Sequence, residues 1–270
     1  MLFVCPKCSA PLSECEGRAV CPLAHSYDRA RGGYYNLLLG ASAHTHGDNK
    51  EMVLARRAFL GAGYYSPLAE RVSALVLASA PEGARVLDIG LGEGYYTDFI
   101  ERALLSRDGY TRVAGFDISK DAVRVAGGKN KRISLAVASA YRMPISDRAV
   151  DVAVNMFSPL ALSETRRVLK SGGSFIMAIP GRRHLYALKA AIYDNPYENE
   201  VADTALDGFT LECEETLSYQ MELSDSETLR SLFMMTPYAY RTGARERERL
   251  YSLEKLDVEA DFQIFVYKKN

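Results

Sequence analysis

Residues 86–94 read VLDIGLGEG, a short and largely apolar run that ends in three glycines at alternate positions. A helical pattern begins directly afterwards, near Tyr95. An apolar strand that turns through glycines into a helix is typical of the first strand of a doubly wound α/β sheet. Because glycines let a ligand approach the backbone closely, the stretch predicts a ligand site at the carboxyl end of this strand.

The flanking sequence continues this alternation of strand and helix. Helical patterns, one of them over residues 163–171, are interspersed with strand-like runs at 112–119, 133–139, 150–157, 172–180, 209–223 and 260–269. This order predicts a mostly parallel sheet within a domain spanning 81–270. Upstream, a helical pattern begins at Glu51 and a second begins near Pro67. We therefore expect 37–80 to form a linker, polar at 40–50, and helices that lead into the sheet domain.

The composition is that of a folded globular chain. Its 270 residues are 48% hydrophobic and 25% charged, and the formal net charge is −1. Such a chain has no overall attraction to nucleic acid or to an anionic membrane, so any polyanion site must be a local patch. No apolar stretch is long enough to span a bilayer, and the N-terminus lacks a signal-peptide pattern, which predicts no membrane partner and a cytoplasmic location.

The first 36 residues contain a set of metal ligands. Cys5, Cys8, Cys21 and His25 follow the spacing C-x2-C-x12-C-x3-H, which is typical of a zinc knuckle. Four ligands complete the coordination tetrahedron, so the zinc is expected to be structural and 1–36 to be a small zinc-binding domain. The alternative, a thioredoxin-like redox pair, is disfavoured because these cysteines lie outside any strand–helix–strand unit.

Acidic residues at the glycine loop discriminate between two adenosine cofactors. Asp88 precedes the glycines, and Asp117 ends the next strand, where a carboxylate can accept hydrogen bonds from ribose hydroxyls. NAD sites prefer G-x-G-x-x-G around a pyrophosphate, which Asp88 would repel. A carboxylate suits a cofactor that carries an ammonium and a sulfonium, so the loop favours S-adenosylmethionine.

These features resemble the class I methyltransferases that use S-adenosylmethionine, whose doubly wound sheet is Rossmann-like. The likeness continues through residues 147–157 to a turn at 167–173. It implies that Asp117 holds the ribose and that Ser139 borders the adenine. Tyr65 and Tyr95 are predicted by their positions to lie over the cofactor, and His184 is a further site candidate by position. The predicted cofactor residues are Tyr65, Asp88, Gly90, Gly92, Gly94, Tyr95, Asp117, Ser139 and His184.

Three further blocks narrow the family. Residues 21–37 follow C-x3-H-x-Y-D-x-A-R-x-G-Y-x-N-L, residues 47–68 follow G-D-x2-E-M-x2-A-R-R-A-F-L-x2-G-x-Y-x-P-L, and residues 180–185 read PGRRHL. These blocks resemble the bacterial large-subunit ribosomal RNA guanine-N1-methyltransferases, the RlmA family. The resemblance implies methylation of guanine N1 in a hairpin loop of 23S ribosomal RNA. It also implies a homodimer whose two zinc knuckles form an RNA-binding cleft.

The local chemistry is compatible with an RNA substrate. Residues 1–57 carry seven Lys or Arg and five Asp or Glu, an excess of about +2, interleaved with tyrosines that suit a looped-out base. The predicted RNA contacts are Arg29, Arg31, Tyr34, Arg56 and Arg57. The loop after the fourth strand, NMFSP at 155–159, supplies Asn155 and Pro159 as catalytic candidates by position, and no general base is evident.

Two other functions remain open from the sequence. The first is a small-molecule methyltransferase with a zinc-stabilised lid, because the catalytic domain also resembles the ubiquinone-biosynthesis type. The second is a zinc-dependent RNA-binding protein that has lost catalysis. The intact Asp88, Gly90, Gly92 and Asp117 argue against the second.

Overall fold

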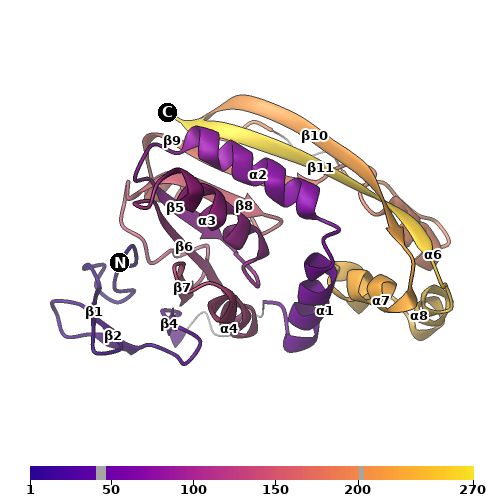
Figure 1. Cartoon of the computed structure of the whole chain (residues 1–270), viewed down its shortest axis with the longest axis horizontal. Coiled ribbons are helices and arrows are strands. Elements are labelled where there is room, and N and C mark those ends of the chain that lie inside the picture. The colour runs from indigo at the N-terminus through magenta and orange to yellow at the C-terminus, as the bar shows by residue number, and fades with distance from the viewer. Residues whose placement is uncertain (41–46, 201–203) are drawn as a thin grey trace.

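A mixed eight-stranded sheet forms the centre of the protein (Figure 1). The computed structural model describes residues 1–40, 47–200 and 204–270, so most of the predicted polar linker at 40–50 lies outside the described residues. Across the sheet, the strands are β10 (Phe209–Leu223), β11 (Leu256–Lys269), β9 (Leu169–Pro180), β8 (Val150–Met156), β5 (Arg85–Ile89), β6 (Arg112–Asp117), β7 (Ser134–Val137) and β4 (Tyr34–Asn36).

Strands β4 to β9 of this sheet pair in parallel, whereas β11 runs antiparallel to both β9 and β10. From β5 the chain passes to β6 and β7 on one side, then returns to β8 on the other side of β5. The order of the strands therefore reverses between β5 and β8. In open α/β sheets, ligands bind at the carboxyl ends of the strands beside such a reversal.

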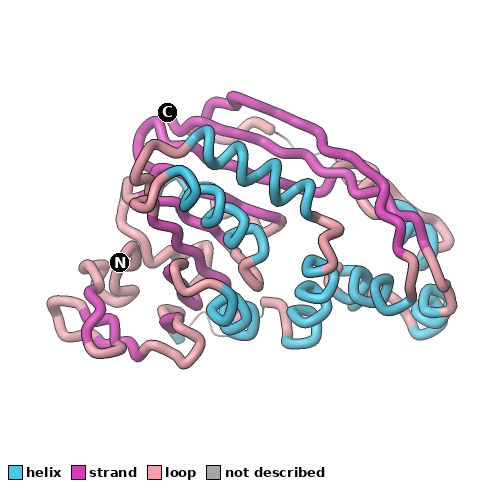
Figure 2. The backbone as a smooth tube through the Cα atoms, viewed as in Figure 1, coloured by secondary structure: helices cyan, strands magenta, loops and turns pink. Residues whose placement is uncertain are grey.

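Helices cover one face of the sheet and flank its carboxyl edge (Figure 2). On this face, Val72, Ile100 and Val123 of three different helices belong to the same buried apolar cluster as Val86 and Val154 of the sheet. The helices are α1 (Lys50–Gly61), α2 (Ser66–Ser79), α3 (Tyr95–Arg107), α4 (Lys120–Lys129), α5 (Leu162–Val168), α6 (Tyr186–Ile192), α7 (Ser226–Met234) and α8 (Ala244–Tyr251), with a short 3-10 helix at Pro237–Tyr240. None of the helices in the described ranges is long and apolar enough to cross a membrane.

The opposite face is covered by α5 and by the N-terminal segment. This segment contains a small antiparallel sheet of β1 (Ser13–Cys15), β2 (Arg18–Val20) and β3 (Ser26–Asp28). The connection from β7 to β8, residues 138–149, contains no helix. Phe3 forms a β-bridge with Ile145 there and is only 1% exposed. The N-terminal segment thus buries a part of the sheet that the β7–β8 connection leaves uncovered.

Strand β4 ties this segment to the main sheet. Tyr34, Tyr35 and Asn36 pair in parallel with β7, opposite Leu135 and its two successors. Tyr35 and Leu37 then pack into the same apolar cluster as Phe3. The predicted zinc-binding zone, residues 1–36, therefore ends in a strand of the main sheet.

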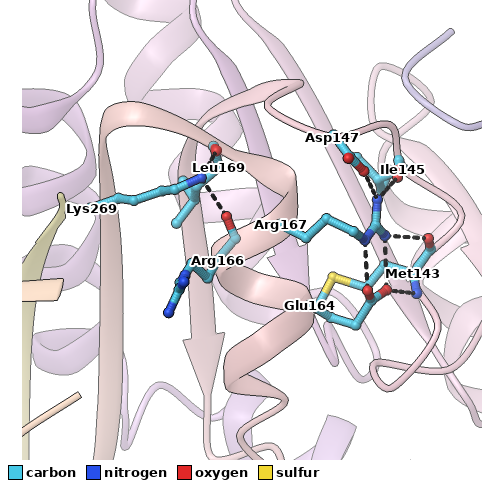
Figure 3. A network of polar contacts seen from close by, with 8 residues as sticks. All are labelled: Met143, Ile145, Asp147, Glu164, Arg166, Arg167, Leu169 and Lys269. Carbon is cyan, nitrogen blue, oxygen red and sulfur yellow. Dashed lines mark hydrogen bonds and ion pairs between the residues drawn. The ribbon is translucent and has the colours of Figure 1, made fainter. Parts of the chain in front are cut away.

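A polar network fixes the β7–β8 connection against α5 (Figure 3). Arg167 donates to the carbonyl oxygens of Met143 and Ile145, at 3.0 and 2.7 Å, and pairs with Glu164 and Asp147. Burial of several guanidinium donors against carbonyls and carboxylates makes this a rigid junction. The surface on which Phe3 packs is consequently held in place by α5.

Two sequence expectations differ from the structure in this region. The predicted helix over 163–171 ends at Val168, and the predicted turn at 167–173 lies mostly within β9. The ladder with β8 shifts register there, because Val150 pairs with Leu169 whereas Val152 pairs with Ser174. Gly172, with φ at 69°, supplies the left-handed conformation that such an irregularity needs.

Candidate cofactor site and metal centre

The glycine loop joins β5 to α3 at the carboxyl edge of the sheet. Gly90, Gly92 and Gly94 all have left-handed φ values, 76°, 58° and 80°, which residues with a Cβ rarely adopt. A Cβ on Gly94 would lie 3.0 Å from that of Ala126, so this glycine lets α3 pack closely on α4. The nearest neighbour of a Cβ on Gly92 would be Nη1 of Arg56, at 4.0 Å. A ligand can therefore approach the backbone at Gly92.

The carboxylate of Asp117 lies beside this loop at the end of β6. It accepts hydrogen bonds from the amides of Gly92, at 3.0 Å, and Ser119, at 2.7 Å. Burial raises its pKa, although these two amides oppose the shift. An acceptor on the strand after the glycine loop is in the position expected for a group that holds a ribose.

Asp88 is almost fully buried, with 1% of its surface exposed, and faces α3. Its Oδ2 accepts a hydrogen bond of 2.6 Å from Thr97, whereas its Oδ1 has no partner among the described residues. Burial raises its pKa to about 7, and the nearby Asp117 adds to the shift. A buried carboxylate without a cation is costly. The acidic pair therefore fits a cofactor with an ammonium and a sulfonium better than one with a pyrophosphate.

Two more predicted cofactor residues lie at the same edge. Ser139 follows β7 and is half-buried, and its hydroxyl accepts a hydrogen bond of 3.3 Å from the amide of Tyr141. Tyr95 begins α3 directly after Gly94, and its ring packs against Phe99 with centroids 5.1 Å apart. Both residues adjoin the glycine loop or the strands beside it.

Tyr65 and His184 come together from distant parts of the chain inside an aromatic cluster. The Tyr65 hydroxyl lies 3.2 Å from Nε2 of His184, and both rings pack on Phe262. The amide of Asp261 donates to Nδ1 of His184 at 3.3 Å. Burial lowers the pKa of His184 to about 3. This histidine is therefore neutral near pH 7.

The loop after β8 lies next to the glycine loop. Ser158 donates to the carbonyl of Ile89 at 2.8 Å and leaves no space for a Cβ on Gly90. Asn155 is 1% exposed; its Oδ1 accepts from the amide of Ser158 at 3.1 Å, and its Nδ2 has no partner among the described residues. Pro159 is exposed. The structure thus places Asn155 beneath this loop and Pro159 on its surface.

Phe157, in the same loop, was not among the predicted site residues. Its φ of 60° is left-handed, which is unusual for a residue with a bulky side chain, yet its ring is 38% exposed. It lies 5.7 Å from Phe262 and 6.2 Å from Tyr96, centroid to centroid. In the sequence, only its place two residues after Asn155 could have indicated Phe157 as a site residue. The left-handed backbone conformation that turns the ring outward cannot be predicted from its residue type.

The four predicted metal ligands converge. The sulfur atoms of Cys5, Cys8 and Cys21 and a ring nitrogen of His25 all lie within 4.8 Å of one another. Nδ1 of His25 is 3.4 Å from the sulfurs of both Cys5 and Cys21, and the sulfurs of Cys8 and Cys21 are 3.6 Å apart. Zinc–sulfur bonds of about 2.3 Å in a tetrahedron separate the sulfurs by about 3.8 Å. The cluster has the size and chemistry of a closed zinc site.

An additional contact supports the thiolate form of one ligand. The Tyr27 hydroxyl lies 3.2 Å from the sulfur of Cys5. Burial opposes ionisation of Cys5, but the hydrogen bond from Tyr27 and backbone amides lower its pKa to about 6. Hydrogen bonds to ligand atoms orient and tune a metal site. Tyr27 therefore belongs to the support of this centre.

The predicted RNA contacts separate into distinct environments. Arg29 pairs with Glu14 at 3.0 Å, whereas Arg31 and Arg57 are exposed. Tyr34 is only 3% exposed and belongs to the apolar core. Its ring is therefore unavailable for stacking on RNA, which corrects that expectation. Arg56 is directed toward the glycine loop, as described above.

Comparison with known proteins identifies the class. Residues 86–173 match the family described as Methyltransferase domain, and residues 3–40 match the family described as RlmA, N-terminal. Together with the strand order and the acidic glycine loop, these matches define a class I S-adenosylmethionine-dependent methyltransferase with a zinc ribbon whose Cys and His residues suit a structural zinc ion.

Relatives that span the whole chain identify the family. A predicted 23S rRNA (guanine-N(1)-)-methyltransferase of Micromonospora griseorubida is 32% identical over 98% of this chain and 96% of its own length. The 23S rRNA (guanine(748)-N(1))-methyltransferase of Streptomyces fradiae is 32% identical over 91% and 88%. A predicted enzyme of the same kind from Bacillus subtilis strain 168 is 29% identical over 99% and 97%. The chain belongs to the family of 23S rRNA guanine-N1-methyltransferases.

Proposed function

We propose that this protein methylates N1 of a guanine in a hairpin loop of 23S ribosomal RNA, with S-adenosylmethionine as the methyl donor. The observation that carries the proposal is that this one chain combines an acidic glycine loop with an RlmA-type zinc ribbon. Its similarity to 23S rRNA guanine-N1-methyltransferases covers most of its length and most of theirs. Neither element alone specifies a ribosomal RNA substrate.

The cofactor supplies an electrophilic methyl group on a positively charged sulfur. We assign the ribose to Asp117, the adenine border to Ser139 and the cationic amino-acid part to the buried Asp88. The backbone at Gly92 offers the close approach that this cofactor needs. We also assign Tyr65, Tyr95 and His184 to the aromatic surroundings of the cofactor; Tyr65 and His184 pack on each other, and Tyr95 directly follows the glycine loop. These residues bind and orient the cofactor. Alignment of the reacting atoms is expected to supply most of the rate enhancement.

The acceptor guanine must leave its stem, because a paired N1 is inaccessible. Phe157 is the exposed aromatic ring beside the glycine loop, and we propose that the guanine stacks on it. Asn155, bonded to the amide of Ser158, positions this loop from below rather than touching the base. This gives the two catalytic candidates, Asn155 and Pro159, a role in shaping the loop.

During transfer, guanine N1 gains the methyl group and loses its proton, and the electron pair of the broken carbon–sulfur bond stays on sulfur. His184 is a poor acceptor for this proton, since its pKa is about 3 and it is buried. Burial raises the pKa of Tyr65 well above its ordinary value, so this phenol stays protonated. We propose that the proton passes to water at the open face of Phe157.

We also propose that Arg29, Arg31 and Arg57 contact the RNA backbone, and that two copies of the chain form a homodimer whose zinc ribbons line the RNA-binding cleft. In this proposal residues 1–36 are the RNA-recognition domain, 37–80 are the linker and helices that lead into the catalytic domain, and 81–270 are the methyltransferase domain. Ribosomal RNA as the substrate puts the site of action in the cytoplasm.

The test is transfer of a labelled methyl group from S-adenosylmethionine to unmodified large-subunit ribosomal RNA, followed by mass spectrometry of the nucleosides. N1-methylguanosine as the single product supports the proposal. Incorporation at another atom, or none into RNA but transfer to a phenol or quinone precursor, refutes it and favours a small-molecule methyltransferase.

A further inference from the structure

Arg56 is held at the mouth of the cofactor site rather than on an exposed RNA-facing surface. It lies in the second turn of α1, and its Nη1 is 4.0 Å from the place where a Cβ on Gly92 would lie. Its Nη1 pairs closely with the carboxylate of Asp48, and its Nη2 donates to the carbonyl of Met235 at 3.1 Å. Only 30% of its side chain is exposed. A guanidinium has five N–H donors, and these contacts leave several of them for a ligand.

The segment before α1 fixes Arg56 in this place. The hydroxyl of Ser119 donates to the carbonyl of Asp48 at 2.6 Å, directly beside the amide that bonds Asp117. A Cβ on Gly47 would lie 2.7 Å from the side chain of Ile118, so only glycine allows this close packing. Asn49 then caps α1 by accepting from the amide of Met52 at 3.0 Å. The start of α1 is thus anchored to the end of β6, next to the ribose position.

The charges around the loop make Arg56 distinctive. Asp88 and Asp117 supply carboxylates at this edge that suit the ammonium, the sulfonium and the ribose hydroxyls of the cofactor, whereas the carboxylate of Asp48 is paired with Arg56. The cofactor also carries one negative group, the α-carboxylate of its methionine part, and this group requires a cation. Two other basic residues act on the buried Glu93 of the loop: Lys129 is already paired with it, and Arg57 is exposed.

We infer that Arg56 binds the α-carboxylate of S-adenosylmethionine, and that Asp48 positions its guanidinium. The planar guanidinium presents paired N–H donors that match the two oxygens of a carboxylate. The ammonium group of a lysine lacks this paired geometry. The inference rests on the cofactor of the proposed function and is independent of the RNA substrate. It separates two adjacent arginines, because Arg56 serves the cofactor whereas Arg57, exposed one position further along α1, serves the RNA.

The experiment uses two ligands that differ in the amino-acid part. S-adenosylhomocysteine has the α-carboxylate, and 5′-methylthioadenosine keeps the adenosine and the thioether but lacks the amino acid. Dissociation constants for both are measured by calorimetry on the full chain without RNA. We expect Arg56→Met to raise the dissociation constant of S-adenosylhomocysteine by about tenfold or more. The dissociation constant of 5′-methylthioadenosine should change by less than about twofold. Lys50→Met, at an exposed position on the same helix, is the matched control and should leave both constants unchanged.

Three outcomes overturn the inference. Equal weakening of both ligands by Arg56→Met would make the arginine a general support of the loop. Unchanged affinity for S-adenosylhomocysteine would place the carboxylate elsewhere, and equal effects of Arg56→Met and Lys50→Met would reduce the effect to net charge. Arg56→Lys, which keeps the charge and the aliphatic stem, tests the same point if the Met variant does not fold, and it should weaken S-adenosylhomocysteine alone. Failure of the unaltered protein to bind either ligand refutes the proposed cofactor itself.

Discussion

The hydroxyl of Tyr65 and Nε2 of His184 lie 3.2 Å apart, although the two residues are separated by more than a hundred positions. Because the amide of Asp261 donates to Nδ1, the hydrogen of the neutral ring is on Nε2 and is donated to the tyrosine oxygen. The pair therefore has a defined direction of hydrogen bonding. It joins the N-terminal end of α2 to the loop after β9, across the aromatic cluster.

This pair predicts a pH dependence of stability. The pKa of His184 is lowered to about 3 by burial, whereas a histidine in an unfolded chain titrates near 6.5. Between these values the unfolded chain binds the extra proton, so stability falls as the pH drops from about 6.5 toward 3 and is fully present above about 6.5. His184→Gln, which can still donate to Tyr65, should flatten this part of a plot of unfolding free energy against pH. A plot with the same slope for both proteins would contradict the assignment.

Asp88 predicts an opposite effect of pH in the absence of cofactor. Burial raises its pKa to about 7, so the folded chain holds its proton when the unfolded chain has lost it, and stability decreases as the pH rises from about 4 to 7. Asp88→Asn should therefore melt higher than the unaltered protein at pH 8. It should also lose most of the increase in melting temperature that saturating S-adenosylhomocysteine produces. A variant that is still stabilised by this ligand to the normal extent would remove Asp88 from the site.

The exposed position of Phe157 predicts that its replacement lowers activity on RNA without changing cofactor binding. Phe157→Ala should lower kcat/KM for the RNA by about 5- to 150-fold, since stacking of a base on an aromatic ring contributes roughly 1–3 kcal/mol. The affinity for S-adenosylhomocysteine should not change, and Phe157→Tyr should retain most of the activity. Tyr141→Ala is the control, because Tyr141 is also exposed and comes after β7, a strand that ends at the same edge of the sheet. Equal losses in the two alanine variants would argue against a specific stacking role.

The zinc centre predicts that metal loss affects the main sheet. Cys8→Ser removes one ligand and should release the metal, as measured by elemental analysis. Because Phe3 and Tyr35 pack on the sheet, amide hydrogen exchange should accelerate in β7 and in residues 143–149 as well as in the first 36 residues. Cys15→Ser, at an exposed cysteine outside the ligand set, should leave both properties unaltered. Normal exchange in β7 after metal loss would show that the ribbon does not support the sheet.

The sequence predicts the centre of the fold well because its signals there are local. The glycine loop, the alternation of strands and helices and the spacing of Cys5, Cys8, Cys21 and His25 are each readable within a few residues. The placement of β10 at 209–223 is confirmed at both ends. Such patterns depend on backbone conformation and ligand geometry, which neighbouring residues determine.

The remaining features depend on contacts between distant segments. Residues 34–36 are too short to indicate a strand by themselves, and only β7 makes them one. Arg56 has the same local character as Arg57, and its role follows from the docking of α1 beside Asp117. The outward ring of Phe157 depends on a left-handed backbone that its residue type disfavours. None of these three relationships is encoded by periodicity or spacing.

The pairing of β4 with β7 also constrains the order in which the chain can fold during synthesis. Tyr35 lies opposite Ala136, so the N-terminal segment leaves the ribosome about a hundred residues before its partner strand exists. During that interval the bound metal is what can hold the ribbon in its native conformation. A shortage of zinc would therefore reduce the yield of correctly assembled enzyme, while molecules that had already matured would keep their catalytic rate.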